Sequence, residues 1–91
     1  MMRRCRLDFA ALDSEAAVHD ALARQLALPA HYGRNLDALW DCLTRDVVGP
    51  VEIRLAPSAA ARPEMRAFLG RLSALLREAQ TARPDLHFVQ E

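Results

Sequence analysis

Two carboxylates, Asp37 and Asp41, stand four residues apart in a stretch whose other residues indicate a helix. Side chains at this spacing lie on one face of a helix, so the two acids would form one negative surface. Trp40 lies at the edge of the same surface. Such a surface can bind a cationic cleft, where a carboxylate takes the place of a phosphate.

A turn comes directly before this helix and positions it. Pro29 and Gly33 indicate the turn, because proline and glycine commonly interrupt helices and strands. Asn35 is a suitable N-cap, because its side-chain oxygen can accept a hydrogen bond from a free backbone N–H one turn further on. Asp37 then falls in the first turn, where the helix dipole favours negative charge. Apolar residues on the opposite face predict a stripe that a core would bury. They are Leu36, Leu39 and Leu43.

The run from Leu28 to Thr44 closely resembles the signature of the barstar family, small proteins that inhibit extracellular-type bacterial ribonucleases. The matching pieces are Leu28-Pro29, Tyr32-Gly33 and the unbroken run from Asn35 to Thr44. The likeness continues more weakly across nearly the whole chain, with a second strong point at Arg77-Glu78-Ala79. The resemblance implies an α/β fold: a small three-stranded parallel sheet packed with three or four helices.

The resemblance also implies roles for individual residues. Asp41 would be the central phosphate mimic, Asp37 a second carboxylate contact and Glu78 an outlying acidic contact that acts mainly on the association rate. The turn would present aromatic side chains toward the enzyme. The implied partner-binding residues are His31, Tyr32, Gly33, Asn35, Leu36, Asp37, Trp40, Asp41 and Glu78.

Each of these residues also has a purely structural interpretation. The two aspartates can be a solvated helix face, and Trp40 can be packing at the edge of the core. Asn35 can be only a cap and Leu36 only a core residue. Glu78 can be an exposed helix residue near an arginine.

Four positions depart from the family pattern. His31 replaces the usual second tyrosine; it could stack on a residue of the enzyme and make binding pH-sensitive, or be a solvated loop histidine. Arg34 stands where a barstar sequence has an acid, and Arg45-Asp46 replace a Gly-Trp pair. Arg45 follows Asp41 by four residues and could fold back on it. These changes leave open whether the partner is barnase-like or a diverged toxin.

Composition restricts the class of protein. At 91 residues with 52% hydrophobic content, the chain is expected to form a single globular domain over residues 1–91. Its 12 basic residues, all arginine, balance 12 acidic ones, which disfavours general binding to nucleic acid. Cys5 and Cys42 are expected to be reduced, buried thiols. We see no signal peptide or membrane-spanning run, which predicts a cytoplasmic protein.

The remaining pattern alternates strands and helices, which favours a parallel sheet with unequally buried faces. A strand is expected around residues 5–9, and then a helix that begins at Asp13 or Ser14. A second strand covers residues 51–55, and a long helix runs from Pro63 to Arg83-Pro84. A short last strand begins at Leu86. Residues 56–62 could form a short helix or a loop.

The sequence is compatible with three functions. The first is an intracellular inhibitor, or immunity protein, of a barnase-like ribonuclease that is a monomer when free. The second is an interaction module for a diverged toxin or a non-nuclease partner. The third is an enzyme, and it is disfavoured. Asp41 and Cys42 diverge by roughly 100° around a helix, and no catalytic motif, metal site or cofactor site is evident.

Overall fold

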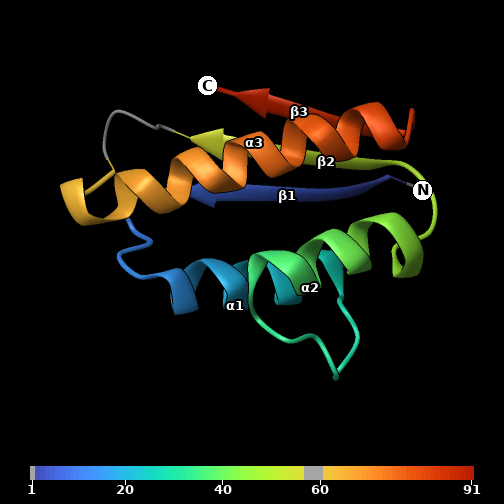
Figure 1. The fold of residues 1–91 in the computed structure, drawn as a ribbon, viewed down its shortest axis with the longest axis horizontal. Coiled ribbons are helices and arrows are strands. Elements are labelled where there is room, and N and C mark those ends of the chain that lie inside the picture. Colours follow the sequence, from blue (N-terminus) through green and yellow to red (C-terminus); the bar gives the residue numbers. More distant parts are fainter. Residues whose placement is uncertain (1, 57–60) are drawn as a thin grey trace.

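The computed structural model describes residues 2–56 and 61–91 and contains one three-stranded parallel sheet (Figure 1). The strands are β1 (Arg3–Asp8), β2 (Val51–Ala56) and β3 (Leu86–Gln90), in that spatial order. The α-helices are α1 (Glu15–Leu26), α2 (Leu36–Asp41) and α3 (Arg66–Ala82). A π-helical segment, η1 (Cys42–Asp46), continues α2, and a 3₁₀ turn, η3 (Pro63–Met65), leads into α3. The predicted α/β fold class is confirmed.

Apolar and charged residues alternate along the strands, so the sheet has one buried face and one open face. In β1 and β2, Cys5, Leu7, Ile53 and Leu55 point into the core, while the residues between them are charged. The three described α-helices pack on the buried face. The two faces are therefore unequally buried, as the strand pattern predicts.

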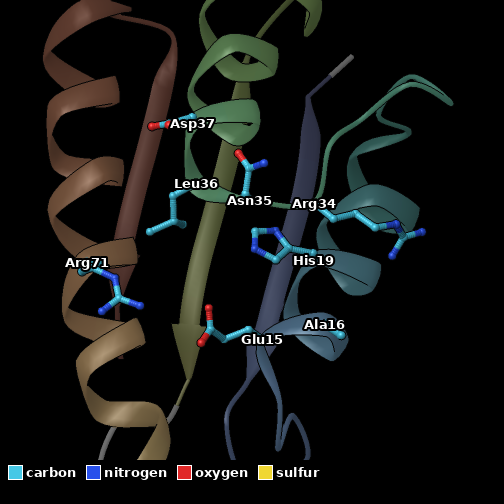
Figure 2. A pocket seen from close by; sticks show the side chains of 8 residues that line it. All are labelled: Glu15, Ala16, His19, Arg34, Asn35, Leu36, Asp37 and Arg71. Atoms are coloured by element: carbon cyan, nitrogen blue, oxygen red, sulfur yellow. The ribbon is translucent and has the colours of Figure 1, made fainter.

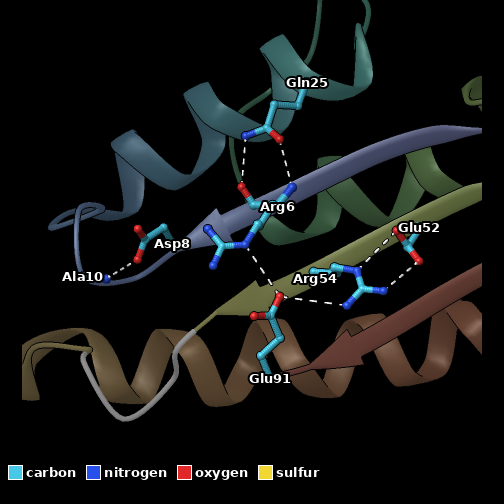
Figure 3. A network of polar contacts seen from close by, with 7 residues as sticks. All are labelled: Arg6, Asp8, Ala10, Gln25, Glu52, Arg54 and Glu91. Carbon is cyan, nitrogen blue, oxygen red and sulfur yellow. Dashed lines mark hydrogen bonds and ion pairs between the residues drawn. The ribbon is translucent and has the colours of Figure 1, made fainter.

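The open face carries ion pairs within β2, between β1 and β2, and with Glu91 just after β3; Figure 3 shows those of Arg6 and Arg54. Glu52 lies 3.8 Å from Arg4 and 3.3 Å from Arg54, and Glu91 lies 3.6 Å from Arg6 and 4.0 Å from Arg54. The pairs are solvent-exposed, so each contributes little to stability. Together they keep the face polar.

α1 begins at Ser14, whose hydroxyl accepts a hydrogen bond from the Ala17 N–H at 3.1 Å. Of the two caps that the sequence allows, Asp13 and Ser14, the structure therefore uses Ser14. The helix ends at Ala27, which adopts the left-handed conformation with φ 52°. Glycine is the usual residue in that conformation. The helix end was therefore not marked in the sequence.

The core lies between the sheet and the helices and includes the predicted apolar stripes. Leu39 and Leu43 are fully buried, and Leu36 is partly buried. Cys5 and Cys42 are buried free thiols, as expected. Burial raises the pKa of Cys5 to about 12 and also raises the pKa of Cys42.

α3 and β3 follow the sequence prediction closely. Pro63 opens the 3₁₀ turn before α3, and the helix ends at Arg83. The open question over residues 56–62 concerns mainly positions 57–60, which lie outside the described residues. No described helix is long and apolar enough to cross a bilayer.

Candidate functional site

α2 carries the two predicted carboxylates on a short, firmly capped helix. The Asn35 side chain accepts a hydrogen bond from the Ala38 N–H at 2.7 Å, which confirms the predicted cap. Asp37 and Asp41 are exposed, whereas Leu39 on the same helix is fully buried. Burial of one face thus directs the two acids to solvent.

A hollow of about 410 Å³ lies between the turn and the start of η1, and Asp41 lines it. Its wall combines four predicted residues with two charged residues of η1. The predicted residues are His31, Tyr32, Gly33 and Asp41, and the charged ones are Arg45 and Asp46. The fold therefore brings the turn and Asp41 together.

A second hollow, of about 340 Å³, lies between α2 and α3. Asp37 and Trp40 line it from α2, and Glu78 lines it from α3. Glu78 is 38 or more positions from either in the chain, so only the packing of α3 against α2 places it here. Arg71, one of the arginines that the sequence places near Glu78, lies in the same wall.

A third hollow, of about 430 Å³, connects α1, α2 and α3 (Figure 2). Asn35, Leu36 and Asp37 line it from the α2 side, and Glu15 and His19 line it from α1. Each of the nine predicted residues thus lines at least one of these three hollows, which lie along the turn, α2 and α3. Their role in binding a partner stays a prediction.

Tyr32 faces inward, unlike its neighbour His31. Its side chain is 7% exposed, and its hydroxyl lies 2.5 Å from Nδ1 of His19, which is itself 3% exposed. Burial raises the pKa of Tyr32 and lowers the pKa of His19. Tyr32 thus anchors the turn to α1, while the exposed His31 remains available for contact.

The two arginines that depart from the family pattern have different surroundings. Arg34 adopts a left-handed conformation with φ 55° and forms an ion pair with Asp20 of α1. Arg45 lines the same hollow as Asp41, but the two do not form an ion pair in the described structure. Arg45 belongs to the π-helical segment η1.

Arg83 holds the other end of the α2–η1 segment, a role that the sequence did not reveal. Its guanidinium donates hydrogen bonds to the carbonyl oxygens of Leu43, Val47 and Gly49 at 2.7, 2.8 and 2.6 Å. Two further bonds, at 2.8 and 3.0 Å, join it to Asp85 and lower the pKa of that carboxyl. All five guanidinium N–H groups are thereby used.

The described residues contain no cluster of metal-ligating side chains. No group of three or more His, Cys, Asp or Glu side chains could hold a metal ion within residues 2–56 and 61–91. Cys42 is 3% exposed with a raised pKa, the reverse of a reactive thiolate. What the surface offers is exposed carboxylates on rigid elements.

Comparison with known proteins finds similarity over almost the entire chain. Residues 2–90 match the family model described as "Barstar (barnase inhibitor)". The protein named "Putative ribonuclease inhibitor YrdF" of Bacillus subtilis (strain 168) is 33% identical over 84 residues, which cover 92% of each chain.

Proposed function

This chain belongs to the barstar family, and from that premise we propose that it inhibits a barnase-like ribonuclease by covering the enzyme's active site. The observation that carries the proposal is the set of exposed acids on two packed helices: Asp37 and Glu78 line one hollow, and Asp41, one helical turn after Asp37, lines another. His31 and Trp40 border the same acids. This surface has the chemistry needed to meet a cationic, phosphate-binding cleft.

The proposed mechanism is occlusion without a chemical step. A ribonuclease holds RNA phosphates with cationic side chains, and a carboxylate of α2 would occupy that place. Asp41 would enter the cleft, and Asp37 would contact it from one turn earlier. Because both acids stand on a helix with a formed cap and a buried face, little ordering is needed on binding.

The biological role that follows is protection of the cell that makes the nuclease. The inhibitor would act in the cytoplasm as an immunity protein, or antitoxin, against an extracellular-type ribonuclease before its export. Complementary charge would speed the encounter, because opposite charges steer association.

The test is titration of the purified protein into barnase-like ribonucleases, including one from the same genome, while RNA cleavage is followed. We expect stoichiometric inhibition. Asp41→Ala should weaken binding at least about thirtyfold, which corresponds to the ~2 kcal/mol typical of an interface hot spot. Glu78→Ala should weaken it at most about fivefold, as exposed charges usually do.

Asp13→Ala is the matched control, because Asp13 is an exposed acid outside the three hollows. It should leave inhibition unchanged. Equal losses from Asp41→Ala and Glu78→Ala would contradict the central role of Asp41.

A second candidate function is favoured by Arg45, an exposed cation in the same hollow as Asp41. A cation there suits a partner with its own acidic group opposite, such as a diverged toxin. Lack of inhibition across the ribonuclease panel would favour this candidate.

A further inference from the structure

We propose that His19 and Asp20 of α1 are positioning residues that hold the partner-binding turn, His31–Asn35, in its binding conformation through Tyr32 and Arg34. The part of this inference that concerns binding rests on the proposed function. Its structural part concerns the free protein and can be tested alone.

The first connection is the buried pair of His19 and Tyr32. Their polar atoms lie 2.5 Å apart, and both side chains are almost fully buried. The His19 ring also packs edge-on against Phe68 of α3, with the ring centres 5.7 Å apart. His19 is therefore fixed by two helices and offers Tyr32 a rigid partner.

The second connection is the ion pair of Asp20 and Arg34. Arg34 has φ 55°, a left-handed conformation that is strained for a non-glycine residue. The pair joins this strained residue to α1. The ion pair also keeps the Arg34 guanidinium close to α1. Asp37 lies on the opposite side of the third hollow (Figure 2).

The two connections come from consecutive residues of α1 and reach residues on either side of Gly33. Two anchors that flank one glycine limit the freedom of the whole turn. The cap residue Asn35 follows directly, so the start of α2 is fixed as well. Binding would then need little reorganisation of the turn.

Hydrogen exchange in the free protein tests the structural part. The Tyr32 amide donates to the Pro29 carbonyl at 3.0 Å and the Ala38 amide to the Asn35 side chain, so both report on the turn. We expect Asp20→Asn to speed their exchange about threefold, because the pair is exposed. His19→Leu should speed it about tenfold, because it leaves a buried hydroxyl without a partner.

Amides in the middle of α3 should keep their exchange rates in Asp20→Asn, since a local loosening does not unfold the molecule. Glu64→Gln is the matched control, because Glu64 is an exposed acid on η3, away from the turn. It should change none of these rates. Unchanged exchange at Tyr32 and Ala38 in both α1 variants would overturn the inference.

Binding tests the functional part, with a barnase-type ribonuclease that the unmodified protein inhibits as the probe. The complex with Asp20→Asn should dissociate about threefold faster, and the double variant with Arg34→Gln should add little, because the two changes break one interaction. Faster exchange in the turn with an unchanged dissociation rate would overturn the positioning role. Faster exchange in a protein that inhibits no ribonuclease would instead support the anchoring and refute the proposed function.

Discussion

Asp41 and Cys42 are neighbours in the chain, yet they have opposite environments. The carboxylate is exposed at the edge of a hollow, and the thiol is buried with a raised pKa. One step around the helix separates the two environments. The acid is thus open to a partner, while the thiol contributes to packing.

His19 is a buried histidine whose protonation is linked to folding. Burial lowers its pKa below 6.5; Glu15 on its own helix opposes the shift, and Arg34 reinforces it. Asp37 and Arg71 also face the same hollow, from α2 and α3. At pH values between the lowered pKa and 6.5, this histidine is protonated to a greater extent in the unfolded chain than in the folded one.

We therefore expect the free energy of unfolding to fall as the pH drops below about 6.5, by up to about 1.4 kcal/mol per pH unit for this one proton. Urea denaturation at a series of pH values, followed by Trp40 fluorescence, measures the slope. His19→Gln should remove it and His31→Asn should keep it. The reverse pattern would show that the exposed histidine is responsible.

At the scale of elements, the α2–η1 segment is held at both ends by other parts of the chain. The turn before it is tied to α1, and Arg83 binds the carbonyl groups after it. Helix ends leave carbonyls without intrahelical partners, and the guanidinium supplies donors for them. A short segment can thus be rigid although it has few internal bonds.

Arg83→Lys should lower the free energy of unfolding by about 2 kcal/mol, because an ammonium cannot reproduce the planar fork that reaches three carbonyls and Asp85. Urea denaturation should show a lower midpoint with an unchanged slope. Arg66→Lys is the control, since Arg66 is exposed at the start of α3. Equal stability of the two variants would contradict the role given to Arg83.

At the scale of the whole molecule, a parallel sheet is left open on one face and has two free edges. Parallel sheets are usually covered on both faces, and exposed edges invite pairing with other chains. Here ion pairs cover the face (Figure 3), and a glutamine blocks each edge. Gln25 bonds both the N–H and the carbonyl of Arg6 on β1, and Gln80 accepts from the Phe88 N–H on β3.

The double variant Gln25→Ala with Gln80→Ala should associate at high concentration, because both edges then offer unpaired backbone groups. Light scattering and sedimentation velocity across a concentration series would detect the larger species. Gln90→Ala is the matched control, because Gln90 bonds Ser73 and Arg77 side chains rather than a strand edge. Association of the control alone would refute the edge explanation.

The sequence by itself determined the local features: the Asn35 cap, the acid pair, the leucine stripe and the alternating strands, which depend on residues within a few positions of one another. Its resemblance to the barstar family supplied the fold and placed Glu78 among the candidate contacts. Only the tertiary structure turned Tyr32 inward onto His19, paired Arg34 with Asp20, and set Arg83 against carbonyls 34 to 40 positions earlier in the chain. Such contacts depend on how helices pack on the sheet, and no local spacing encodes that packing.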